Sequence, residues 1–285
     1  MPDLAIYKLI ISENRPVKLK ILPISSRSLS LNSASRLLPG GVYTTFRTFE
    51  GNKVLPLQHH LGRLEASAAL LEHEIRLEES IIYEAIRAAV TDYLPGDTRI
   101  RLTVPLEYDL GELFISIEPL KSPSEEDYKK GVWVVTYPLH RENPEAKQTS
   151  FIKIADQIRR ELSPGVHEGL LLDDLGRILE GLSSNFFYVR DNKLWTAPQG
   201  VLSGITRGLV LAAASAEKIP VVFRAAPVTE VPMFDEAFIT SSTRSVLPVR
   251  KIDDFIIGKS EKGPVTQLLS NAYWNVIKGM LVDLK

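Results

Sequence analysis

The stretch from Lys147 to Arg207 decides the fold and the chemistry that we expect of this chain. It contains a lysine ahead of a predicted helix (AKQTSFIK, 146–153), an apolar strand with one acid (RILEGLSSNFFYV, 177–189), and a glycine–threonine turn that opens a second helix (LSGITRGLV, 202–210). A lysine amine can form an imine with an aldehyde, a carboxylate can pair with a ring nitrogen, and the N–H groups at a helix N-terminus bind phosphate. Together these groups are suited to a phosphorylated aldehyde cofactor.

The composition is that of an ordinary globular protein. The chain is 44% hydrophobic and 24% charged. Its 285 residues are enough for one large or two modest domains. The net charge of −1 arises from 34 basic and 35 acidic residues spread along the chain, so we expect neither nucleic-acid binding nor membrane binding. A small-molecule substrate is therefore expected.

Several absences in the sequence bear on its location and on metals. The chain has no cysteine, which excludes disulfides and thiolate metal sites and fits a reducing cytoplasm. The first 16 residues lack the regions of a signal peptide, and no later apolar run approaches the roughly 20 residues of a membrane span. The five histidines lack partners at the spacing of metal ligands. These features predict a cytoplasmic protein without a metal site.

Hydrophobic periodicity predicts an α+β chain with two domains. Residues 1–120 read as a small N-terminal α/β domain, in which the strand-like run 41–47 should place Tyr43, Thr45 and Arg47 on one face. Residues 121–130 are the predicted linker, and residues 131–285 read as a larger, strand-rich, cofactor-binding domain with flanking helices. The predicted helices cover residues 61–71, 80–94, 151–162, 206–218 and 265–280.

The motifs resemble those of the class IV, fold type IV pyridoxal phosphate-dependent aminotransferases. That family includes branched-chain and D-amino-acid aminotransferases and aminodeoxychorismate lyase. The resemblance extends from about residue 40 to residue 249, with the motifs in the family's order. It implies pyridoxal 5′-phosphate as the cofactor, a pseudo-barrel in the large domain, a homodimer, and an amino donor and a 2-oxo acid acceptor as small-molecule partners.

The resemblance identifies Lys147 as the catalytic lysine that forms a Schiff base with the cofactor. Lys147 precedes Glu168 of EGLLLD by 21 positions, which is similar to the spacing in D-amino-acid aminotransferases. Lys153 lies within the predicted helix and matches no family position. Lys147 would also move the proton at the substrate α-carbon in a ping-pong transamination.

Two residues are expected at the cofactor ring. EGLSSN resembles the family's EGxxxN signature, which places Glu180 against the protonated ring nitrogen. From the local pattern alone, Glu180 could equally be a half-exposed strand residue. Leu202 would pack on the ring, and Asn185 would shape the turn.

Four residues are expected at the phosphate. In GITR, which resembles the family's phosphate cup, Ile205 and Thr206 would donate backbone N–H groups. Arg63 in HLGRLEASA and Ser242 in ITSSTRSVLPV resemble further phosphate ligands from elsewhere in the chain. Without the resemblance, Arg63 would read as a solvated helix arginine.

The expected substrate-binding residues are less typical of the family. Tyr43 resembles the D-amino-acid type, although YTTFR stands where the branched-chain type has FEGIR. The backbone of Thr243 would lie near the substrate carboxylate, and Arg244, Arg101 or Arg47 would clamp a carboxylate. Phe151 stands near the position where branched-chain enzymes carry a tyrosine. The hydroxyl contact that this tyrosine makes to the cofactor cannot form here, because phenylalanine has no hydroxyl.

Two alternatives to a transaminase stay open at this point. A lyase of the aminodeoxychorismate type would use the same lysine and cofactor and release pyruvate. A non-catalytic binding protein could retain the fold, although the presence of Lys147, Glu180 and Arg63 argues against it.

Overall fold

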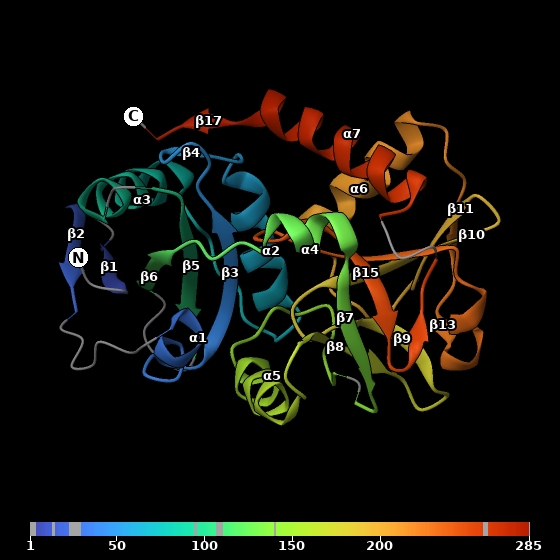
Figure 1. The fold of residues 1–285 in the computed structure, drawn as a ribbon. Coiled ribbons are helices and arrows are strands. Elements are labelled where there is room, and N and C mark those ends of the chain that lie inside the picture. The colour runs from blue at the N-terminus through green and yellow to red at the C-terminus, as the bar shows by residue number, and fades with distance from the viewer. Residues whose placement is uncertain are drawn as a thin grey trace. The chain divides into compact units, whose positions relative to one another are not determined.

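The computed structural model describes residues 4–12, 15–22, 30–93, 96–106, 111–139, 141–258 and 262–284. The chain folds into two compact units. The first unit contains Met1–Lys121, Ala146–Ile154 and Met280–Lys285, and the second contains Ser122–Glu145 and Ala155–Gly279. Figure 1 draws the elements of both units with the labels used below.

An antiparallel sheet forms the centre of the first unit (Figure 1). In the described residues its strand order is β2-β1-β6-β5-β3. Its strands are β1 (Ala5–Ser12), β2 (Arg15–Ile21), β3 (Gly41–Arg47), β5 (Thr98–Pro105) and β6 (Glu112–Pro119). Along β3, Val42, Thr44 and Phe46 are buried, whereas Tyr43, Thr45 and Arg47 are half-buried. This alternation puts Tyr43, Thr45 and Arg47 on one face, as their period of two predicts.

Helices cover both faces of this sheet. The helices are α1 (Leu31–Ala34), α2 (Gln58–Ala69) and α3 (Glu79–Tyr93). The buried residues of α2 and α3 share one apolar core with Tyr7 and Leu9 of β1, whereas Ile6 of β1 packs with α1 in a separate core. Since successive strand residues point to opposite faces, α1 lies on the face opposite to α2 and α3.

A turn at Glu50–Asn52 leads from the end of β3 into a very short strand. Glu50 and Gly51 have positive φ angles of 52° and 82°, which makes the turn. The strand that follows, β4 (Lys53–Val54), has only two residues and pairs with β17 (Val282–Asp283) near the end of the chain. The sequence does not predict this pairing, because its partners are separated by more than 200 positions.

The segment 146–154 belongs to the first unit, whereas the sequence-based division assigned it to the second domain. Its main chain runs along the free edge of β3. Tyr43 N donates to Lys147 O at 2.9 Å, and Thr149 N donates to Gly41 O at 2.8 Å. Gly41 has to be glycine for the close pairing of β3 with the end of β5, because a Cβ atom there would lie 2.0 Å from Val104 O.

A larger mixed sheet forms the second unit (Figure 1). Its described strands follow the order β12-β11-β10-β14-β15-β7-β8-β9-β13, with β16 paired to β15. The strands are β7 (Val132–Tyr137), β8 (Val166–Leu172), β9 (Arg177–Gly181), β10 (Asn185–Arg190), β11 (Lys193–Thr196), β12 (Val221–Phe223), β13 (Ala226–Pro227), β14 (Glu236–Ser241), β15 (Ser245–Ile252) and β16 (Phe255–Ile256). Because β9 also pairs with β10 through Glu180 and Asn185, the path from β10 to β9 closes on itself. This closure gives the barrel-like sheet that was expected.

The run 177–189, which the sequence predicts as one strand, is two strands. A turn at residues 182–184 separates β9 from β10 and is closed by a 2.7 Å hydrogen bond from Gly181 N to Ser184 O. A Cβ atom on Gly181 would lie 2.3 Å from Ser184 Oγ, so the turn needs glycine at this position. The apolar residues hide the break, because both strands are buried in the same core.

Helices flank the second sheet, and one of them occupies the predicted linker. α4 (Glu125–Lys130) begins with a capping box between Ser124 and Asp127. The other helices are α5 (Ser150–Glu161), whose first residues belong to the first unit, α6 (Ile205–Ala216), α7 (Pro264–Met280) and the 3-10 helix η1 (Val228–Met233). Within the part of the chain that the structure describes, no helix is long and apolar enough to cross a membrane.

We expect Glu236→Ala to destabilise the second unit. The buried Glu236 carboxylate accepts hydrogen bonds from Val265 N at 3.0 Å and Thr266 N at 2.7 Å, and so caps α7. Losing such a cap should lower the free energy of unfolding by about 1–2 kcal/mol, measurable by urea denaturation. Glu217→Ala at the exposed end of α6 is the control, expected within roughly 0.5 kcal/mol of the parent. Equal losses in both variants would contradict the capping role.

Candidate active site

Lys147 is fixed in the first unit through its main chain. Its N–H donates to Ser67 Oγ of α2 at 3.1 Å, and its carbonyl accepts from Tyr43 N of β3 at 2.9 Å. The side-chain Nζ lies 4.8 Å from the centre of the Tyr43 ring, in the range of a cation–π contact. The lysine therefore has a defined position relative to Tyr43.

Arg63 is a cation that lacks an anion within the described residues. Its Nη2 donates to Thr44 Oγ1, and its Nε is buried without a hydrogen-bond partner. No described carboxylate lies within ion-pair distance of Arg63, and burial lowers the pKa of its guanidinium to about 10. Arg63 is thus half-buried with a buried, unpartnered Nε, unlike a solvated helix arginine, and this geometry suits an anionic ligand such as a phosphate.

His60 orients Arg63 through Thr44. His60 Nδ1 lies 2.9 Å from Thr44 Oγ1 and 3.5 Å from Arg63 Nη2. Because a guanidinium only donates hydrogen bonds, Nδ1 is the accepting nitrogen of the ring. Burial, followed by the charge of Arg63, lowers the pKa of His60 well below its usual value, so the ring is neutral at pH 7. His60 was not among the predicted site residues, although it lies three residues before Arg63 on the same helix.

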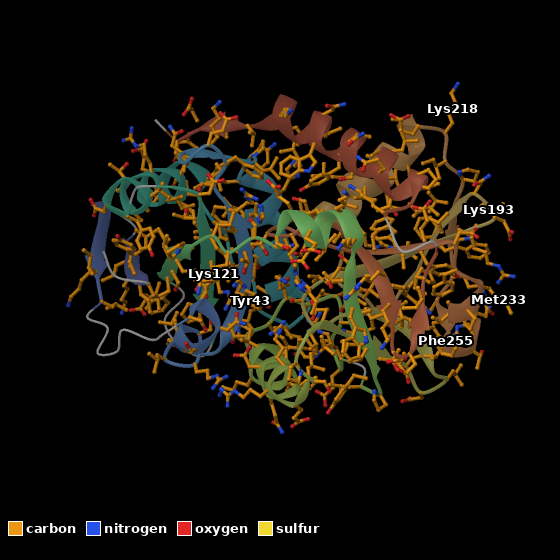
Figure 2. The ribbon with its side chains drawn as sticks, in the orientation of Figure 1. Tyr43, Lys121, Lys193, Lys218, Met233 and Phe255 are labelled. Atoms are coloured by element: carbon orange, nitrogen blue, oxygen red, sulfur yellow. The ribbon has the colours of Figure 1, made fainter. Side chains whose placement is uncertain are left out.

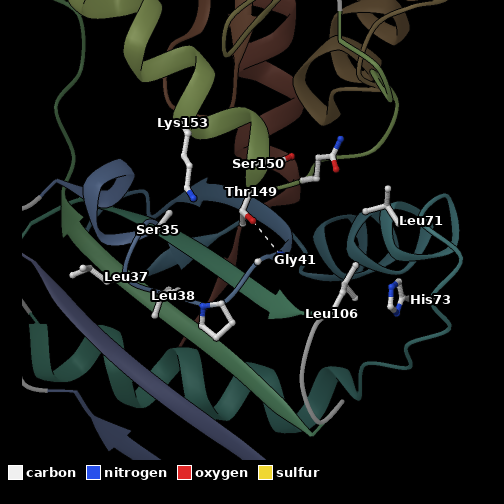
Figure 3. A pocket seen from close by; sticks show the side chains of 13 residues that line it. Ser35, Leu37, Leu38, Gly41, Leu71, His73, Leu106, Thr149, Ser150 and Lys153 are labelled. Atoms are coloured by element: carbon white, nitrogen blue, oxygen red, sulfur yellow. Dashed lines mark hydrogen bonds between the residues drawn. The ribbon is translucent and has the colours of Figure 1, made fainter.

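A cavity of about 690 Å³ opens beside residues 148–153 in the first unit (Figure 3). Thr149, whose Oγ1 accepts from Gly41 N at 3.0 Å, and Lys153 line it together with apolar residues such as Leu38 and Leu106. Lys147 does not line this cavity. Lys153, the alternative lysine, is exposed on α5.

Two of the arginines considered for a substrate carboxylate are engaged within the first unit. Arg47 forms a 2.6 Å ion pair with Asp97. Arg101 is 2% exposed, and its guanidinium ties β5 to α1 and stacks over Tyr43. The hydrogen-bond acceptors of Arg101 are Leu31 O, Asn32 Oδ1, Ser35 Oγ and Thr45 Oγ1. This geometry does not leave two parallel N–H groups of Arg101 for a carboxylate.

Glu180 is the centre of a buried polar cluster in the second unit. Its Oε2 accepts from Leu202 N at 3.0 Å and from Asn185 Nδ2 at 3.2 Å, and Asn185 Nδ2 also donates to Leu202 O at 2.8 Å. Its Oε1 accepts from Arg141 Nη1 at 3.1 Å. The structure thus brings the predicted residues Glu180 and Leu202 together. It adds Arg141, which the sequence analysis missed because Arg141 lies in a polar loop without periodicity.

The first turn of α6 offers donors close to this cluster. Gly204 is the N-cap residue, and this described helix end has no side-chain capping hydrogen bond. The N–H groups of Ile205 and Thr206 have no acceptor within the helix, as at any helix start. A Cβ atom on Gly204 would lie 2.1 Å from Asn185 Oδ1, so glycine keeps this approach open. These donors suit a phosphate group.

Ser242, Thr243 and Arg244 form the turn between β14 and β15 and are half-buried. Tyr128 donates from its hydroxyl to Arg244 O at 2.9 Å, which anchors the turn to α4. The Arg244 side chain pairs with the buried Glu168 at 2.7 Å. The third candidate arginine is therefore also engaged with a carboxylate of its own chain.

A second described cavity is lined by residues other than the predicted site residues. A cavity of about 510 Å³ in the second unit is lined by residues that include Lys193 and Lys218, both at the surface (Figure 2). Across the described ranges, no three histidine, aspartate or glutamate side chains form a group able to hold a metal ion.

Known proteins resemble this chain over most of its length. The sequence profile of the amino-transferase class IV family matches residues 41–252. A probable branched-chain-amino-acid aminotransferase from Thermotoga maritima is 30% identical over 249 residues, covering 85% of this chain and 88% of the relative. A D-alanine aminotransferase from Bacillus licheniformis is 26% identical, covering 83% of this chain and 87% of the relative.

A solved structure shares the fold. The branched-chain amino acid aminotransferase of T.th., crystallised with pyridoxamine 5′-phosphate, superposes with a TM-score of 0.77 at 24% identity, covering 98% of each chain. The profile match spans well over half of the 285 residues and includes Tyr43, Lys147, Glu180 and Thr206. The chain belongs to the class IV aminotransferase family.

Proposed function

We propose that the protein transfers an amino group between an amino acid and a 2-oxo acid by a ping-pong mechanism, with Lys147 as the catalytic residue. Pyridoxal 5′-phosphate is the cofactor of this class of enzyme. The observation that carries the proposal is that the first unit holds both the anchored Lys147 and Arg63, a half-buried cation whose Nε is buried and which has no described carboxylate partner. One residue suits an aldehyde and the other a phosphate.

The residues of the chain fit the cofactor's groups. Arg63, the N–H groups of Ile205 and Thr206, and Ser242 would hold the phosphate, because they are a cation, uncapped helix donors and a hydroxyl. Glu180 would face the ring nitrogen. Leu202, which is buried and fixed by its hydrogen bonds to Glu180 and Asn185, would support the ring. Pyridoxal phosphate supplies an aldehyde that condenses with amines and a ring that accepts electron density.

Lys147 has two roles in this proposal. Its amine would hold the cofactor covalently in the resting enzyme, and once freed it would move a proton from the substrate α-carbon to the cofactor carbon that carries the aldehyde. The main-chain bonds to Ser67 and Tyr43 keep its Cα in place while the side chain changes its role. The Tyr43 ring steadies the ammonium form of Lys147 at 4.8 Å.

Tyr43 and the Thr243 backbone are the proposed contacts of the substrate. Arg47, Arg101 and Arg244 are held by protein acceptors, so the proposal assigns the carboxylate to the turn at Thr243. Relatives named for branched-chain amino acids and for D-alanine make aliphatic amino acids the first substrates to test. We also propose a cytoplasmic homodimer, as the family resemblance implies.

The decisive test traps the lysine. Protein loaded with pyridoxal phosphate should be yellow, bleach when an amino donor is added, and carry a borohydride-fixed label on the peptide containing Lys147. Lys147→Ala should abolish both the colour and the label, whereas Lys153→Ala, on the exposed face of α5, should keep both. A label on Lys153, or a colourless parent protein, would refute the proposal. Pyruvate release without an amino acceptor would instead identify a lyase.

The two glycines of GITRG provide a matched test of the phosphate site. Gly204→Ala places a Cβ atom 2.1 Å from Asn185 Oδ1 and should displace Asn185 from Glu180 and Leu202. We expect the dissociation constant for pyridoxal phosphate to rise by about tenfold or more, measured by absorbance titration. Gly208→Ala meets nothing within 4 Å and should leave that constant unchanged, while stabilising α6 by about 0.5–1 kcal/mol. Equal affinities of the two variants would count against the assignment.

A further inference from the structure

Arg244 donates from all three of its guanidinium nitrogens to acceptors of its own unit. Nε donates to Ser241 Oγ at 3.2 Å, and Nη1 donates to Glu168 Oε2 at 2.7 Å. Nη2 donates to Ser183 O at 3.3 Å and to Ser183 Oγ at 2.5 Å. A bidentate clamp on a substrate carboxylate needs two nitrogens with free N–H groups on one edge. Arg244 is therefore arranged for a different task.

The partners of Arg244 come from three elements of the second unit. Ser241 ends β14, next to the turn that carries Ser242 and Thr243. Glu168 lies on β8, and Ser183 lies in the turn between β9 and β10, which carry Glu180 and Asn185. The Arg244 side chain thus links two turns. One carries Ser242 and Thr243, the proposed contacts of the phosphate and the substrate carboxylate, and the other lies beside Glu180, the proposed partner of the ring nitrogen.

Glu168 is the fixed point of this linkage. It is 1% exposed, and its Oε2 accepts from Arg244, from Ser183 Oγ at 3.0 Å and from Ser184 Oγ at 3.3 Å. Burial alone would raise the pKa of the Glu168 carboxyl, but the charges of Arg244 and Arg159 and the hydrogen bonds hold that pKa below its usual value. Glu168 is therefore ionised, and the loss of Arg244 would leave a buried charge without its nearest cation.

We propose that Arg244 is a positioning residue, which together with Glu168 and Ser183 holds the Ser242–Thr243 turn in register with the turn between Glu180 and Asn185. This inference rests on the proposed function, because it assumes the roles given to those two turns. Since both turns would act on the same bound molecule, their relative position would govern cofactor affinity and the affinity for every substrate alike.

The test compares Arg244→Met, Arg244→Lys, Glu168→Gln and the double variant Glu168→Gln/Arg244→Met with the parent. Arg224→Met is the control, because Arg224 forms a more exposed ion pair with Glu230 in the same unit. The measurements are the dissociation constant for pyridoxal phosphate and kcat and KM with two acceptors, 2-oxoglutarate and 4-methyl-2-oxopentanoate. Circular dichroism reports whether each variant folds.

We expect Arg244→Met to weaken pyridoxal phosphate binding by about tenfold or more and to raise the KM of both acceptors by a common factor. Arg244→Lys should recover part of the loss. The double variant should bind the cofactor better than Arg244→Met alone, because the buried charge is gone. If Arg244→Met does not fold, Glu168→Gln, which keeps the shape of the side chain, should still weaken cofactor binding more than Arg224→Met does.

Three results would overturn the inference. One is unchanged cofactor affinity in both Arg244→Met and Glu168→Gln. Another is a KM that rises for the dicarboxylate acceptor alone, which would make Arg244 a direct substrate ligand. A third is strict additivity in the double variant. A parent protein that does not bind pyridoxal phosphate would instead refute the proposed function, so the two failures are distinguishable.

Discussion

The pair formed by Glu180 and Asn185 closes the sheet of the second unit, because it is the register pair that joins β9 to β10. The carboxylate of Glu180 accepts hydrogen bonds from Asn185 Nδ2, from Leu202 N and from Arg141. A buried carboxylate needs donors for its lone pairs, and here those donors come from a strand, from the loop before α6 and from the loop before Lys147. The barrel closure and the proposed ring contact therefore meet at one residue, Glu180.

Glu168 and Glu180 of the second unit have charged partners, whereas Arg63 of the first unit does not among the described residues. In the described part of the second unit, the buried carboxylates Glu168 and Glu180 each face an arginine, Arg244 and Arg141 respectively. Desolvating such pairs costs free energy, which the attraction and the added hydrogen bonds offset. In the described part of the first unit, Arg63 has a hydroxyl and an imidazole as partners and no carboxylate. This contrast, rather than the mere presence of an arginine, indicates where an anionic ligand is needed.

Local sequence patterns predicted the elements of the fold but not the contacts that complete its sites. Period-two alternation placed Tyr43, and helix signals placed α6 close to its observed bounds, because both depend on neighbours along the chain. The break at residues 182–184 was missed, because the apolar runs on its two sides read as one strand and the polar residues between them are few. The engagement of Arg101 and Arg244 was also missed, because their partners, apart from Ser241 beside Arg244, lie 56 or more positions away.

The family motifs supplied what spacing alone could not, and the structure explains why those residues can act. Thr44 and Tyr43 are neighbours on the edge strand β3, so their side chains point to opposite faces of the sheet. Arg63 bonds to Thr44, and Lys147 lies over the ring of Tyr43, so two cations flank the same edge. A charged imidazole beside them would add repulsion. The neutral state of His60, imposed by burial and by Arg63, avoids this repulsion beside Arg63 and Lys147.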